Sequence, residues 1–213
     1  MDKITDNFTS YFKKLILQSF CNLEHLSYAK EDIQAAVDCD CIFNFESYKE
    51  LLIFNNGLDV VNYVCNLDFN KVLFTRALYC KLNEIITLGS LDQELYGKYR
   101  KVKVTVKALG VLPPPKMKEV DTLVARLNDL SQIADPKDCV INTMLKLMKM
   151  QPFENGNKRT ALMLANCALI KQNDGIIYFD NTNYPEFKER LSAYYVTGNT
   201  DVVNYLKSHC MSI

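Results

Sequence analysis

The sequence predicts an all-α protein built around one buried central helix, with a single short β segment. The chain of 213 residues has only 7 glycines and 6 prolines. Its long stretches with apolar residues every three or four positions favour helices over a β-sandwich or barrel. Residues 161–170 are apolar on nearly every side, so this helix has no face for solvent and is expected at the centre. A chain of this length supports one well-buried core, or two small ones at most.

The N-terminal part of the chain is predicted to be helical. Apolar side chains recur at spacings of three and four over residues 8–24, which predicts an amphipathic helix. Residues 30–37 indicate a second, short helix, with Ser27 as a candidate N-cap upstream. Two more helices are expected within residues 58–88, ending near Gly89.

One strand interrupts the helices. Residues 102–107 alternate apolar and mostly cationic side chains, a period of two, and Gly110 allows the chain to turn back. The prolines at 113–115 stiffen the exit, since each ring fixes φ and removes a donor. With no internal repeat or low-complexity linker in sight, we expect a single domain. The remaining helices are predicted at about 117–131, 137–150, 184–196 and 199–208.

The charge balance and the cysteines exclude several classes of protein. Lys+Arg and Asp+Glu both number 25, so no net field draws the chain onto nucleic acid or acidic lipid. The N-terminus lacks a signal peptide, and no stretch approaches the roughly 18–20 apolar residues of a membrane span. Cysteines within apolar helical patterns indicate reduced thiols in a cytoplasm. The close spacing of Cys39 and Cys41, without a partner pair, argues against zinc.

The most informative stretch is the loop at residues 151–162, which joins two apolar helices. It places Gly156, Asn157, Lys158 and Arg159 at the start of the second helix. The first backbone N–H groups of a helix are unpaired and carry partial positive charge, so this arrangement suits an anion. The alternative is an ordinary helix–turn–helix joint, in which Gly156 is a C-cap and the two cations are solvated.

The loop resembles the signature of the Fic (filamentation/death-on-curing) family, His-Pro-Phe-x-(Asp/Glu/Asn)-Gly-Asn-(Gly/Lys)-Arg. Similarity to the family extends over roughly residues 58–208, which implies a Fic-type helical domain at 58–213 behind an N-terminal helical arm at 1–57. In this family a β-hairpin flap aligns a target protein by main-chain pairing. The resemblance assigns that flap to Val104, Val106, Leu109 and Gly110.

Family members mostly transfer AMP from ATP to a hydroxyl of a target protein, and the resemblance implies the same partners here: ATP, Mg²⁺ and a protein with a Ser, Thr or Tyr hydroxyl. No nucleic acid and no membrane are expected. By resemblance, Gly156 and Asn157 form an anion nest and Arg159 holds a terminal phosphate in a fork geometry. Asn155 stands where the family binds magnesium, although a neutral amide is a weak ligand. Phe153 is the buried anchor of the loop.

Two positions leave the transferred group open. Lys158 matches the death-on-curing branch, which is similar to a kinase that phosphorylates a translation factor. Leu162 replaces the second arginine of many AMP-transferring members. AMP transfer and phosphate transfer need opposite nucleotide poses, and both remain alternatives.

Gln151 stands where the family has its catalytic histidine. That histidine takes the proton of the attacking hydroxyl, a contribution of roughly 10²- to 10⁴-fold, whereas a glutamine amide has no basic nitrogen. The chain's two histidines, His25 and His209, lie outside the matched loop and its flanking helices. We therefore expect a domain that binds nucleotide and transfers poorly or not at all. The alternative is a degenerate binding module that keeps its nucleotide pocket and hairpin and works by occupancy or by pairing with a partner protein.

Many Fic proteins silence themselves with a helix of the form (Ser/Thr)-x-x-x-Glu-(Gly/Asn), whose glutamate pairs with the second arginine. Residues 19–25 resemble it loosely and make Glu24 the inhibitory candidate. Ser19 lies one position too far from Glu24, and His25 replaces Gly/Asn. Because Leu162 stands at the usual partner position, inhibition would have to act through Arg159 or Lys158. The alternative is an ordinary solvated glutamate.

Overall fold

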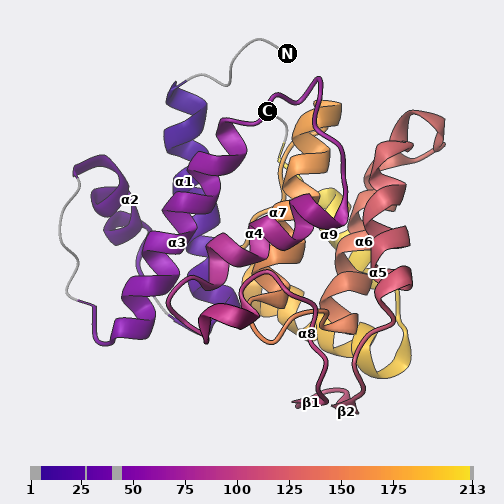
Figure 1. Cartoon of the computed structure of the whole chain (residues 1–213). Helices are drawn as coiled ribbons and strands as arrows, with labels where there is room; N and C mark the ends of the chain where they lie inside the picture. The colour runs from indigo at the N-terminus through magenta and orange to yellow at the C-terminus, as the bar shows by residue number, and fades with distance from the viewer. Residues whose placement is uncertain (1–5, 27, 40–44, 212–213) are drawn as a thin grey trace.

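The computed structural model describes residues 6–26, 28–39 and 45–211, excluding the side chains of residues 6, 7 and 39. Within these ranges the chain forms helices and one two-stranded antiparallel hairpin (Figure 1). The helices are α1 (Asp6–Leu23), α2 (Lys30–Cys39), α3 (Tyr48–Cys65), α4 (Arg76–Thr87), α5 (Met117–Ala125), α6 (Pro136–Met150), α7 (Asn157–Gln172), α8 (Tyr184–Thr197) and α9 (Asp201–Ser208), with 3₁₀ turns at Gln93–Leu95, Arg126–Asn128 and Leu130–Gln132. The all-α prediction is confirmed. The predicted N-cap Ser27, the side chain of Cys39 and the whole of Cys41 lie outside what the structure describes.

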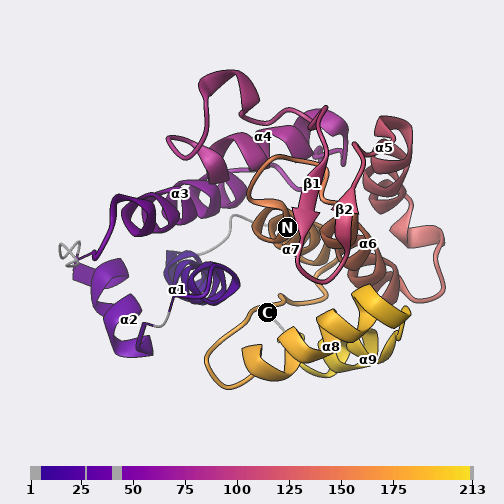
Figure 2. The ribbon, with the colours of Figure 1, turned by 90° about the horizontal axis from the view of Figure 1, so that it is seen from below.

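Helix α7 is the centre of the molecule, as its composition predicts. From Arg159 to Ile170 every side chain is buried, and Figure 2 shows α7 surrounded by α4, α6 and α8. The core that it organises also takes in side chains of α1 and α3. No helix in the described part of the chain has the length and apolar character needed to cross a membrane.

Helices α1 and α3 pack tightly against each other. A Cβ at Gly57 would lie 2.6 Å from Leu17 Cδ2, so any larger residue at this position would require the Leu17 side chain to shift. Helix α3 begins at Tyr48, earlier than expected, because Ser47 caps it by accepting a hydrogen bond from Glu50 N. The domain boundary expected between residues 57 and 58 falls inside α3.

The helix predicted over residues 117–131 is too long: α5 ends at Ala125 and two 3₁₀ turns follow. Asn128 explains the difference, since its side chain accepts from Phe74 N at 2.8 Å and donates to Phe74 O at 2.9 Å. This side chain satisfies the backbone of another segment, and the chain bends to bring it there.

The expected hairpin is present. Strand β1 (Val104–Val106) pairs antiparallel with β2 (Gly110–Leu112), with Thr105 opposite Val111. Gly110 has φ +72°, which suits the left-handed position of a turn. The hairpin projects from the lower end of the molecule in Figure 1 and lies across the end of α7 in Figure 2.

Candidate functional site

Gln151 ends α6 in a left-handed conformation, with φ 49° and ψ 63°. Its side-chain Nε2 donates to Met148 O at 2.5 Å, and its Oε1 accepts from Asn157 Nδ2 at 3.1 Å. A non-glycine residue in this region is strained, and the two hydrogen bonds offset that strain. The amide is therefore part of what shapes the loop.

Asn157 and Phe153 fix the middle of the loop. Asn157 accepts from Phe153 N at 2.8 Å and donates to Phe153 O at 2.9 Å. The Phe153 ring is buried, with its centroid 4.9 Å from that of Tyr79 and 5.3 Å from that of Tyr99, distances typical of packed aromatic pairs. The Asn157 side chain thus faces the loop, and an anion would meet its backbone N–H.

Arg100 holds the loop to the base of the hairpin, a role that the sequence did not reveal. Its guanidinium is buried and donates to the carbonyls of Gln151 at 2.6 Å, Val102 at 2.6 Å and Pro113 at 2.7 Å. Its backbone N–H donates to Pro152 O at 2.9 Å. Burial lowers the pKa of Arg100. Since all these acceptors are backbone oxygens, no charged partner in the sequence points to this function.

Gly156 allows the loop to lie against α4. Its φ is +73°, and a Cβ there would lie 2.8 Å from Thr87 Cγ2. Asn83 of α4, fully buried, donates to Asn155 O at 2.9 Å and to Thr160 Oγ1 at 3.1 Å. Asn83 is a second positioning residue that sequence reasoning missed, because its partners lie more than 70 positions away.

The N-terminus of α7 has free donors. Its first backbone hydrogen bond runs from Thr160 N to Gly156 O at 2.8 Å. The N–H groups of Asn157, Lys158 and Arg159 precede that bond, and no acceptor for them is found among the described residues. Three unpaired N–H groups at the start of a 16-residue helix attract negative charge.

The two cations of the loop are directed at the end of α1. Arg159 is only 3% exposed, and its Nε lies 3.0 Å from Glu24 Oε1. That Nε makes no well-aligned hydrogen bond, so the attraction between the two opposite charges is the main contribution of this contact. Burial lowers the pKa of Arg159 and Glu24 opposes that shift. Lys158 Nζ donates to Leu23 O at 2.8 Å, and burial lowers its pKa as well.

Glu24 is thus an ion-pair partner of the loop, and its ordinary solvated alternative does not describe this structure. Its carboxylate also lies 3.7 Å from Lys49 Nζ and is 18% exposed. The Glu24 carboxylate pairs with Arg159 although the residues around Glu24 depart from the family pattern.

A cavity of about 230 Å³ opens beside Gln151 and Lys158. Leu23 and His25 line it from the end of α1, and Val106 and Ala108 from the hairpin. Its wall on α8 consists of Tyr184, Phe187, Lys188, Leu191, Ser192 and Tyr195. Burial, followed by the charges of Lys158 and Lys188, lowers the pKa of His25. His25 therefore shares a cavity with Gln151, which its position in the sequence did not indicate.

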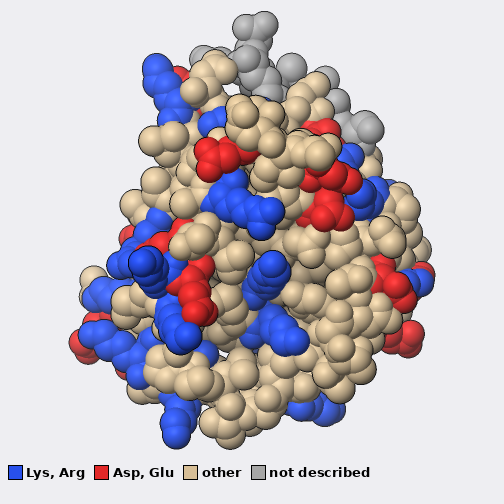
Figure 3. All heavy atoms as spheres, turned by 90° about the vertical axis from the view of Figure 1, so that its right-hand side faces the viewer, with Lys and Arg blue, Asp and Glu red and all other residues tan. Residues whose placement is uncertain are grey.

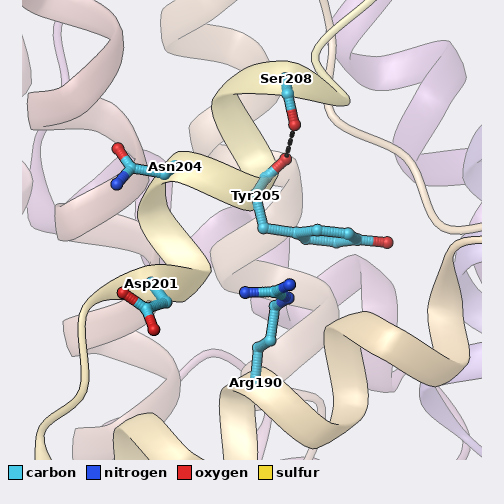
Figure 4. Close-up of a pocket in the computed structure, with 5 residues that line it drawn as sticks. All are labelled: Arg190, Asp201, Asn204, Tyr205 and Ser208. Atoms are coloured by element: carbon cyan, nitrogen blue, oxygen red, sulfur yellow. Dashed lines mark hydrogen bonds between the residues drawn. The ribbon is translucent and has the colours of Figure 1, made fainter.

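The other histidine lies elsewhere. His209 stacks on Tyr205, with ring centroids 4.2 Å apart. Tyr205 also lines a separate pocket of about 340 Å³ with Arg190, where Ser208 Oγ donates to Tyr205 O (Figure 4). Arg190 there is already paired with Glu186, and none of the predicted site residues lines this pocket.

The described residues contain no group of three or more His, Cys, Asp or Glu able to hold a metal. Asn155 Oδ1, the expected magnesium ligand, accepts from Gly156 N at 2.6 Å. A neutral amide already engaged in this way fits Mg²⁺ poorly, since the ion prefers carboxylates and phosphates.

The fold and the site describe a helical domain with a β-hairpin. The start of α7, whose free N–H groups suit an anion, lies beneath this hairpin. A model of the Fic/DOC family matches residues 73–169. This chain therefore carries a Fic/DOC-family domain. No curated protein has a sequence that matches the chain.

Solved structures share the fold. Fic-1 from C. elegans superposes with a TM-score of 0.76 at 17% identity, covering 93% of this chain and 60% of that one. A Fic-domain-containing signalling protein from Bacteroides thetaiotaomicron gives 0.73 at 16% identity, covering 95% and 85%. A Fic family protein from Desulfovibrio desulfuricans gives 0.66 at 15%, covering 96% and 65%. The chain thus spans less than two thirds of the solved C. elegans and D. desulfuricans chains, and at these identities the likeness concerns the fold.

Proposed function

We propose that this chain is a nucleotide-binding Fic domain that transfers AMP from ATP to a protein hydroxyl slowly at best, and whose nucleotide site is closed by Glu24. The observation that carries the proposal is the pairing at the start of α7. Three free N–H groups and the buried Arg159 form a site for negative charge, and the carboxylate of Glu24 lies 3.0 Å from that arginine. The carboxylate of Glu24, just beyond the end of α1, balances the arginine that would bind a phosphate.

The same contacts support the proposal that the chain binds a nucleotide. The phosphates would bind the N–H groups of residues 157–159, and Arg159 would turn from Glu24 to a phosphate. The cavity under the hairpin offers Val106, Leu191 and Tyr195 as apolar surface for the base, since ligand pockets are mostly apolar with a few polar groups. Mg²⁺ would arrive with the phosphates, and we derive no step through it because Asn155 fits it poorly.

The slow transfer is attributed to Gln151. In AMP transfer the target oxygen bonds to the α-phosphorus, the bond to pyrophosphate breaks, and the hydroxyl proton must leave. Gln151 cannot accept that proton, and its amide is already engaged with Met148 and Asn157. The proton would pass to water, without the roughly 10²- to 10⁴-fold contribution of a positioned base.

The second candidate is a binding module without transferase activity. It is favoured by the hydrogen bonds of the Gln151 amide within the loop. These bonds stabilise the shape of the loop and do not serve proton transfer. Phosphate transfer, the kinase alternative, receives less support, because Lys158 donates to Leu23 O and is not directed towards a phosphate position.

Labelled ATP distinguishes these functions. The wild-type chain, Gln151→His and Glu24→Gln/Gln151→His would be incubated with lysate and either α- or γ-labelled ATP, with Gln132→His as the matched control. We expect α-label on protein from the double variant, and little from the wild type. Protein labelling by the γ-label alone would assign phosphate transfer instead.

Calorimetry with ATP tests binding independently of transfer. Binding without any labelling would leave the binding module as the function. No binding of ATP by Glu24→Gln at about 1 mM, the weak end of useful affinities, would refute the nucleotide site itself.

A further inference from the structure

The hairpin and the segments that flank it form a strongly basic surface. Between residues 95 and 118 the chain contains no Asp or Glu. It contains instead the buried Arg100 and a set of exposed lysines, Lys98, Lys101, Lys103, Lys107, Lys116 and Lys118, here called the flap lysines. In a chain with 25 cations and 25 anions, this is a local concentration of one sign. Figure 3 shows Lys and Arg gathered at the lower left of one face, with a few acidic side chains among them.

The flap lysines are largely unpaired. Lys116 lies 3.0 Å from Glu119, whereas the described residues supply no salt bridge to the other five. Exposed lysines also protect a strand edge from aggregation. Here, however, they accompany exposed apolar side chains: Val102 is 55% exposed, Val111 64% and Met117 42%. Exposed apolar side chains next to cations that have no charged partner are characteristic of a docking surface.

The strand sorts its side chains by face. Lys103, Thr105 and Lys107 are exposed, while Val104 and Val106 are half-buried, as the period of two requires. Val106 also lines the cavity that contains Gln151. Val106 therefore faces the site, whereas Thr105 and the lysines that flank β1 at its two ends are exposed to solvent.

From this placement we propose that the hairpin docks an extended, acidic segment of the target protein. A strand added beside β1 would place two carboxylates four residues apart, opposite Lys103 and Lys107, which flank β1. The hydroxyl to be modified would lie between two acidic residues, on the face directed at the cavity. This inference rests on the proposed function and adds the chemistry of the target: one acidic residue next to the modified hydroxyl and a second three positions away on its other side.

Peptide binding to the full chain, without nucleotide, tests the inference. The probe is a fluorescein-labelled peptide Glu-Val-Glu-Ser-Glu-Val-Glu, and its control replaces each Glu by Gln. Lys103→Glu/Lys107→Glu is compared with Lys30→Glu/Lys71→Glu, which changes the same charge at exposed sites distant in sequence from the hairpin. Two exposed ion pairs of ordinary strength predict a loss of affinity of about 10-fold for the hairpin variant.

The expected result is specific to the hairpin. The acidic peptide should bind more tightly than its Gln control at about 0.05 M salt and lose that advantage at about 0.5 M salt. Equal affinity of the two lysine variants, or of the two peptides, would overturn the inference. Single-stranded oligothymidylate that competes as well as the peptide would also overturn it, because the surface would then be a general polyanion site. Calorimetry with ATP on the same samples shows separately whether the nucleotide site is intact.

Discussion

Replacing Glu24 by glutamine removes the anion beside Arg159 while keeping the size of the side chain. Arg159 is 3% exposed and Glu24 18%, with 3.0 Å between the charged atoms. Breaking a buried ion pair costs roughly 3–5 kcal/mol. Because Glu24 is partly hydrated, we expect a loss of about 2 kcal/mol of folding free energy, which lowers the Tm of a chain of this size by about 4–8 °C.

The same substitution should strengthen nucleotide binding. In the wild type the phosphates must displace one carboxylate and share the region with its charge, whereas in Glu24→Gln the arginine is free. A gain of about 1.4–2.8 kcal/mol corresponds to about 10- to 100-fold in Kd for ATP. The variant should therefore unfold at a lower temperature than the wild type when free, and show the larger rise in Tm when ATP is added.

Thermal unfolding and calorimetry with and without ATP would measure both effects, with Glu186→Gln as the control, since Glu186 pairs with Arg190 on the surface. A Kd for ATP within about twofold of the wild type would show that Glu24 does not close the site, and a stability unchanged from wild type would show that the pair is not formed in solution. A double-mutant cycle with Arg159→Met separates the pair from the two single losses.

Three further predictions concern the loop and its cavity. Arg100→Gln should lower the free energy of unfolding by about 3 kcal/mol, because several buried carbonyls lose a charged donor; chemical denaturation checks this, and a loss below about 1 kcal/mol would contradict it. Gly156→Ala should lower the free energy of unfolding by about 1–3 kcal/mol, because of its φ of +73° and the contact with Thr87, and it should abolish ATP binding. The control Gly198→Ala, also at positive φ but with open space for a Cβ, should keep ATP binding. His25 should titrate in NMR with a pKa below 6.5, and this pKa should rise in Lys158→Gln. Since the folded state then binds less proton than the unfolded state, His25 makes stability fall as pH drops below about 6.5; a pKa at or above that of a free histidine would refute this.

The sequence predicts those features that depend on neighbouring residues. The apolar surface of residues 161–170 predicts the burial of α7, and the alternation at 102–107 predicts the hairpin. The early end of α5 was not predictable, because Asn128 interacts with Phe74, more than 50 positions away.

In the site, too, features that depend on neighbouring residues are predictable and contacts between distant residues are not. The loop motif identifies the residues that form the start of α7, but not how their side chains are used. Asn157 braces Phe153, and Arg100 binds carbonyl oxygens that leave no trace in the amino-acid pattern. The partner of Glu24 depends on where the end of α1 lies relative to α7, which only the packed structure determines.

The end of α1 is attached to α7 at two successive residues: the carbonyl of Leu23 to Lys158, and the carboxylate of Glu24 to Arg159. Neighbours on one short turn cannot separate independently, so both attachments should open together. Release of α1 would then be a single cooperative event, and any ligand that competes for one cation would also free the other.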